Sequence, residues 1–117
     1  MNLEDFFRAI GSDYHSALAR MGNSKDKLKK YVKMFSSDTT AEDLFTAFRQ
    51  EDYVSAFMFA HTLKGLCATL GFSTLHASAS ELTEALRNTV SENANELFDK
   101  VYTDYSTLSQ ALAQLAD

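Results

Sequence analysis

The fold follows from residues 52–71, which read DYVSAFMFAHTLKGLCATLG. The segment contains no proline, and it closes on Gly71, the residue type that most often ends a helix in the left-handed conformation. At ~100° per residue, its large apolar side chains fall in one narrow arc. These side chains are Phe59, Leu63, Leu66 and Leu70. The segment is therefore predicted to be one long helix that buries this stripe.

Polar or glycine breaks divide the rest of the chain into further helices. The first two expected helices cover residues 3–10 and, after a cap at Ser12 or Asp13, residues 14–21. A third begins at Asn23 or Ser24, and a fourth covers residues 41–50. After the long helix, one further helix is capped by Ser73 or Thr74, and the last follows the polar break at residues 88–95. Thr40, with Asp43 three residues later, resembles a capping box for residues 41–50. In the last segment an apolar residue recurs at helical spacing from Leu97 to Leu115.

The composition agrees with an all-helical protein. The 117 residues include no proline, and 29 alanine and leucine residues stand against 5 valine and isoleucine residues. Alanine and leucine favour helices, whereas β-branched residues favour strands. Each long segment has one apolar face, and the connections are short. We predict a single domain over residues 1–117, an all-α, antiparallel up-down four-helix bundle with short N-terminal helices packed across one end.

The charge pattern argues against two classes of partner. The net charge is −5, so the chain has no general attraction for nucleic acid or for anionic lipid. Five lysines form a local exception, which we interpret as a solvated face, with a steering patch for an acidic partner as the alternative: Lys25, Lys27, Lys29, Lys30 and Lys33. No apolar run approaches ~20 residues, and the acidic N-terminus lacks the pattern of a secretory signal. We expect a cytoplasmic protein that binds neither membrane nor nucleic acid, and the single cysteine, Cys67, is compatible with that compartment.

His61 lies ~180° around the long helix from the centre of the apolar stripe, so its ring is predicted to face outward. Its neighbours on that face are sizeable apolar residues on one side and small residues on the other. They are Val54, Phe57 and Met58, and Gly65 and Ala68. An exposed apolar patch of this kind usually marks an interface.

Gly65 and Lys64 complete the arrangement around His61. A glycine inside a helix costs ~1 kcal/mol relative to alanine, so its presence calls for a reason. Because residues four apart stack along a helix, Gly65 would leave the imidazole open to an approaching group; close packing of another helix is the alternative. Lys64, three residues after His61, can reach the same space and stabilise an anionic group held there.

Residues 60–65 read AHTLKG, and residues 70–71 read LG. This pattern resembles the signature of histidine phosphotransfer (HPt) domains of multistep phosphorelays: a histidine, two residues, lysine-glycine, and a leucine-glycine that closes the helix. Further positions also look like the family, namely Glu51, Asp52, Tyr53 and Phe57 before the histidine and Phe72, Leu75 and Leu82 after it. The resemblance covers essentially the whole chain.

The resemblance implies a function. By it, His61 is the phosphoacceptor, Lys64 assists the phosphoryl group and Gly65 gives clearance. The implied partners are the receiver domain of a response regulator, whose aspartate exchanges the phosphoryl group, and a hybrid histidine kinase. Mg²⁺ is expected in the partner receiver, and no cofactor or metal in this chain. The sequence has no Gly-rich phosphate loop and no kinase motif, so we predict a carrier that is not an ATP-dependent enzyme. We also expect a monomer. The predicted docking contacts are Val54, Phe57, Met58 and Ala68.

The chain departs from the family pattern at one position. Many relatives place Glu or Gln 22 residues after the histidine, where it can hydrogen-bond the ring and fix its tautomer. Here Thr83 has that spacing, and Glu84 follows it. A threonine hydroxyl could accept from the ring N–H, which makes Thr83 the candidate orienter. Arg87, 26 residues after His61, is a further candidate for the site.

Three other interpretations compete with a phosphoryl shuttle. A metal-binding bundle would use Glu-x-x-His pairs, and none precedes His15, His61 or His76. An HPt-like bundle that acts only as a protein-interaction module would be expected to lack the histidine. The Gly71-Phe72 pair is also found in the first domain of chemotaxis kinases. The sequence ends at Asp117 without a kinase core, which favours a free-standing shuttle.

Overall fold

The computed structural model describes residues 1–115, and it is all-helical over these residues. The elements are α1 (Leu3–Ala9), α2 (Tyr14–Arg20), α3 (Lys25–Met34), the short 3-10 helix η1 (Phe35–Ser37), α4 (Thr40–Arg49), α5 (Tyr53–Leu70), α6 (Ser73–Leu86) and α7 (Ala94–Ala113). The prediction of an all-α fold is confirmed. No helix in this part of the chain is long and apolar enough to cross a bilayer.

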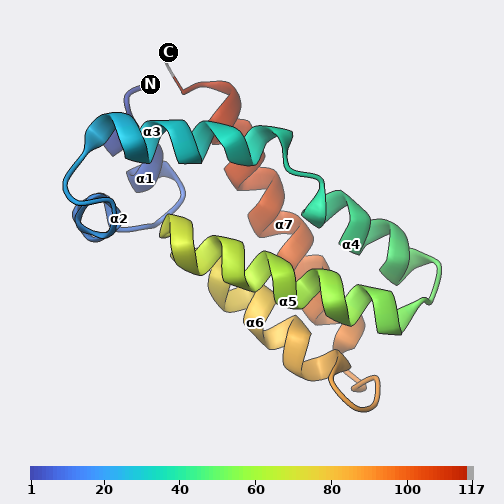
Figure 1. The fold of residues 1–117 in the computed structure, drawn as a ribbon. Coiled ribbons are helices and arrows are strands. Elements are labelled where there is room, and N and C mark those ends of the chain that lie inside the picture. Colours follow the sequence, from blue (N-terminus) through green and yellow to red (C-terminus); the bar gives the residue numbers. More distant parts are fainter. Residues whose placement is uncertain (116–117) are drawn as a thin grey trace.

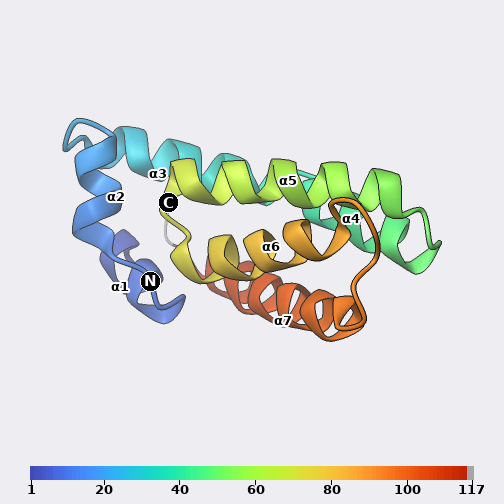
Figure 2. The same ribbon diagram turned by 90° about the horizontal axis from the view of Figure 1, so that it is seen from below.

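The long helices form a bundle, and the two shortest α-helices, α1 and α2, close one end of it. Figure 1 shows α4, α5, α6 and α7 as successive neighbours that run in alternating directions, with α3 leading into α4 along the same side. In Figure 2, α1 and α2 lie together across the end where α6 begins. At this end the N-terminus meets the end of α7, where the Met1 ammonium donates to the carbonyl of Gln114 at 3.1 Å.

Four helices begin at a side chain that accepts a hydrogen bond from an amide of the first turn. These capping residues are Asn2, Asp13, Ser24 and Asp52. Each accepts from one of the backbone N–H groups that have no partner within the helix at its N-terminus. At the other end of α5, Gly71 has φ +78°, the left-handed conformation that its place in the sequence predicted.

The predicted capping box at Thr40 is wrong. Thr40 already belongs to α4, and its amide donates to Oδ1 of Asp38 at 2.8 Å. The hydroxyl of Thr39 donates to Oδ2 of Asp43 at 3.1 Å. The carboxylate of Asp43 therefore binds a side chain, and not the backbone amide that a capping box requires. Asp38 therefore holds the start of α4 from outside the helix, in the extended backbone that follows η1.

The predicted cap of α6 by Ser73 or Thr74 is also wrong. The amide of Ser73 donates to the hydroxyl oxygen of Ser12 at 3.1 Å, and the hydroxyl of Thr74 donates to the carbonyl of Ile10 at 3.1 Å. Both partners lie in the connection between α1 and α2. This connection thus holds the start of α6 across more than sixty residues of sequence, and Ser12 caps its first amide.

Phe72 joins the N-terminal helices to the bundle. It is almost fully buried, and its ring centroid lies 5.9 Å from that of Phe6 and 5.3 Å from that of Phe35. Edge-to-face aromatic contacts of this kind add to the free energy gained by burial. Because Phe72 follows Gly71 directly, the same packing fixes where α5 ends and where α6 turns back.

Candidate functional site

His61 lies on the exposed side of α5, as its position in the sequence predicted. The buried face of the helix is made by Ala56, Ala60, Leu63, Cys67 and Leu70. The centre of this face lies about 50° around the helix from the centre of the predicted apolar stripe. The two differ because Phe59 and Leu66, which belong to the predicted stripe, are only half-buried. His61 is therefore ~140° from the centre of the buried face, on the side toward α6.

The apolar neighbours of His61 are exposed to different extents. Val54 is 77% and Met58 is 62% exposed, and Ala68 is exposed as well. Phe57 is half-buried, and its ring centroid lies 6.2 Å from that of His61. The structure thus places all four of these side chains on the face that surrounds the imidazole.

The position of Gly65 is open to solvent. A Cβ atom built there would meet nothing within 4 Å, and the backbone has ordinary helical geometry. No neighbouring helix packs against this position, so close helix packing does not explain the glycine. Since residues four apart stack along a helix, the open space lies directly beside His61.

Charged side chains of α5 and of the end of α6 lie near His61. Arg87 donates two hydrogen bonds to the carboxylate of Glu84, both 2.9 Å long, and its guanidinium lies 5.2 Å from the ring centroid of Phe57. These hydrogen bonds are the main reason why the pKa of Glu84 is lowered. The charge of Arg87, of the half-buried Lys64 and of the His61 ring lowers it further. The sequence had singled out Arg87 and Lys64, and Glu84 joins them.

Thr83 does not orient the ring of His61, contrary to the expectation from its spacing. Its side chain is fully buried, and its hydroxyl donates to the carbonyl of Ala79 at 2.7 Å within α6. Within residues 1–115 the ring of His61 makes no hydrogen bond and no ion pair. No residue of this part of the chain therefore holds either ring nitrogen of His61 by a hydrogen bond.

The other histidines and the cysteine lie apart from this site. His15 is exposed and packs edge-on against Tyr14, and His76 is half-buried on α6. Among the described residues, no group of three or more His, Cys, Asp or Glu side chains could hold a metal ion. Burial raises the pKa of the Cys67 thiol to about 12, so this thiol is not a nucleophile at neutral pH.

A family model described as Hpt domain matches residues 32–117 of the chain. The match includes η1 and the helices from α4 to α7, and it leaves α1, α2 and most of α3 outside it. No curated protein and no solved structure matches the chain.

Proposed function

Because the chain belongs to the Hpt domain family, whose members carry phosphoryl groups on histidine in phosphorelays, we propose that His61 exchanges a phosphoryl group with the aspartate of a response-regulator receiver domain. Hpt domains are carrier modules that lack an ATP site. The phosphoryl group therefore comes from a partner protein, either a receiver domain or a hybrid histidine kinase. We further propose that the chain acts as a monomer in the cytoplasm.

The observation that carries this proposal is the open space beside His61. A phosphoryl group moves between two proteins only if the attacking atom of one and the leaving atom of the other lie in line on opposite sides of the phosphorus. His61 is exposed on the surface of a rigid 18-residue helix, and nothing fills the space above Gly65. An aspartyl phosphate on a convex partner loop would have room to approach the imidazole there.

In the proposed step, an unprotonated nitrogen of the neutral imidazole attacks the phosphorus of the aspartyl phosphate. The bond between phosphorus and the aspartate oxygen breaks, and the carboxylate leaves with its electron pair. The proton on the other ring nitrogen stays on the ring or passes to water. Transfer in the opposite direction follows the same path, with Mg²⁺ expected on the receiver side.

Lys64 and Arg87 are proposed to offset the charge of the phosphoryl group. A phosphoryl group carries close to two negative charges, and cations fixed nearby stabilise both the bound group and the transition state. Lys64 extends from the same helix as His61, one turn further on. Arg87 already reaches across to Phe57 from the end of α6, while it holds Glu84.

The docking surface is proposed to be the apolar patch around His61, formed by Val54, Phe57, Met58 and Ala68. Two of its members are among the most exposed large apolar side chains of the described residues. Flexible methionine side chains adapt well to partner surfaces. A receiver that covers this patch would also exclude water from the transfer site.

The experiment that tests the proposal follows radiolabel from a phosphorylated receiver domain into this protein. We expect label in the wild type and none in His61→Gln, whose exposed side chain can be replaced without loss of the fold. Circular dichroism of both proteins serves as the control for folding. Equal labelling of the two proteins would rule out His61 as the acceptor and would leave the interaction-only function as the better account.

Replacing Lys64 with alanine is expected to slow transfer from the receiver by about 10-fold to 100-fold, because one charge near the transition state is lost. The free energy of unfolding should change by no more than about 0.5 kcal/mol, since the substitution changes a polar side chain of the helix surface. The measurement is the single-turnover rate of label transfer. Lys30→Ala, an exposed lysine on α3, is the matched control and should transfer at the wild-type rate. An unchanged rate in Lys64→Ala would show that its ammonium does not assist the phosphoryl group.

A further inference from the structure

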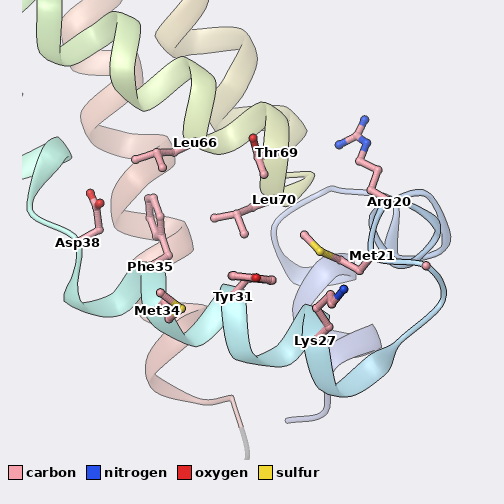
Figure 3. Close-up of a pocket in the computed structure, with 11 residues that line it drawn as sticks. Arg20, Met21, Lys27, Tyr31, Met34, Phe35, Asp38, Leu66, Thr69 and Leu70 are labelled. Atoms are coloured by element: carbon pink, nitrogen blue, oxygen red, sulfur yellow. The ribbon is translucent and has the colours of Figure 1, made fainter.

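A groove of about 760 Å³ lies between α3 and the C-terminal half of α5 (Figure 3). Its walls are two helices, and the end of α2 closes one side. Apolar side chains make most of the lining: Met21, Tyr31, Met34, Phe35, Leu66 and Leu70. Two of these side chains are open to solvent, since Met34 is 57% and Tyr31 is 39% exposed.

The charges of the groove are separated toward its two ends. Figure 3 shows Arg20 and Lys27 at the end next to α2, and Asp38 at the opposite end. Arg20 is held in place by a hydrogen bond of 2.7 Å from its guanidinium to the carbonyl of Ala68. Asp38 is fixed by the hydrogen bond from the amide of Thr40. An occupant with negative charge near α2 would complement this pattern.

The groove is independent of the phosphoryl site. Leu66 and Leu70 lie ~140° and ~180° around α5 from His61, so the two sites open on different faces of the helix. Its α2 wall and most of its α3 wall lie outside the residues that the family model matches. An occupant of the groove would leave His61 accessible to a receiver.

We propose that this groove binds an amphipathic helix of a partner protein, with carboxylate side chains at the end that meets Arg20 and Lys27. Two helical walls with an apolar floor seat a third helix, whose anchors recur at i, i+3, i+4 and i+7. Methionines at the rim, Met21 and Met34, adjust to such anchors. A small apolar molecule fits less well, because ligand sites bury most of their ligand and this groove stays open on one side.

The occupant is selected by charge as well as by shape. The segment from Lys25 to Lys33 holds five lysines and one aspartate in a chain whose net charge is −5. Of these lysines Lys27 lines the groove, at the same end as Arg20, so this end of the groove attracts an acidic helix and repels a basic one. The helix would bring a second protein to the carrier while phosphoryl transfer proceeds at His61.

The test uses a fluorescein-labelled synthetic helix of 15 residues, with leucine at the four anchor positions and glutamate on the polar face, followed by fluorescence anisotropy. We expect saturable binding to the wild type. Met34→Glu should weaken binding at least tenfold, because the substitution removes an apolar anchor contact and adds a negative charge that repels the glutamates of the peptide. Lys27→Glu should weaken it about five-fold to tenfold. Lys25→Glu, which makes the same change on the opposite face of α3, is the matched control and should bind within twofold of the wild type.

Several results would overturn this proposal. One is a dissociation constant weaker than about 1 mM, which corresponds to only ~4 kcal/mol of binding free energy. Others are equal binding of a scrambled peptide of the same composition, equal loss in Lys27→Glu and Lys25→Glu, or saturable binding of oleate in place of the helix. His61→Gln should bind the peptide like the wild type, so failure of the phosphoryl assignment would not affect this outcome. Melting curves of all variants establish that each is folded.

Discussion

Replacing Gly65 with glutamine is expected to slow phosphoryl transfer by at least about 100-fold while it makes the bundle more stable. Glutamine is a better helix former than glycine by roughly 0.5–1 kcal/mol, and the new side chain meets no neighbour at its Cβ. The side chain would stand over the imidazole, one turn away. A displacement of about 1 Å between reacting groups can cost 10²-fold in rate, and a glutamine here would hold the partner further away.

Urea denaturation and single-turnover transfer measure the two effects separately. Gly65→Ala should give a similar gain in stability with a smaller loss of transfer, because its side chain is one methyl group. Thr62→Gln, at an exposed position of the same helix, is the matched control for a long polar side chain and should keep the wild-type rate. Transfer at the wild-type rate in Gly65→Gln would show that the space beside His61 is not used by the partner.

Replacing Gly71 with alanine is expected to lower the free energy of unfolding by about 3 kcal/mol. Part of the loss, ~1–2 kcal/mol, comes from a side chain in the left-handed conformation at φ +78°. The rest comes from overlap, because the new Cβ would lie 2.8 Å from the Cβ of Ala17 in α2, and overpacking costs ~1–3 kcal/mol. The substitution therefore strains both the end of α5 and its contact with the end of the bundle.

A second substitution distinguishes these two causes. In the Ala17→Gly background the overlap is absent, so Gly71→Ala should cost only the conformational part. Urea denaturation of the four proteins in the cycle gives the coupling energy, which we expect to be ~1–2 kcal/mol. Strict additivity of the two substitutions would mean that α2 does not pack against Gly71 as the structure shows.

The helices, most of their ends and the outward position of His61 could be predicted from the sequence. These features depend on local chemistry: apolar periodicity, capping side chains such as Asp13 and Ser24, and the left-handed glycine at position 71. The family membership followed from the residues around His61, and the family match confirmed it over residues 32–117.

The features that could not be predicted depend on residues distant in the sequence. The start of α6 is capped by Ser12, so local sequence could not identify the acceptor. The buried face of α5 is centred near Ala56 and Ala60 because small side chains let α4 and α6 approach closely, whereas a helical wheel gives most weight to large residues such as Phe59. Thr83 is fully buried in the bundle, and its hydroxyl donates to the carbonyl of Ala79 within α6.

The most direct test of the central claim observes the imidazole nitrogens of His61 by ¹⁵N NMR before and after incubation with a phosphorylated receiver. We predict that one ring nitrogen of His61 acquires a one-bond coupling to ³¹P, and that His15 and His76 are unchanged. Acid should remove the coupling, because the nitrogen–phosphorus bond is labile. Phosphoryl label that stays on the protein while the His61 nitrogens show no coupling would contradict the account.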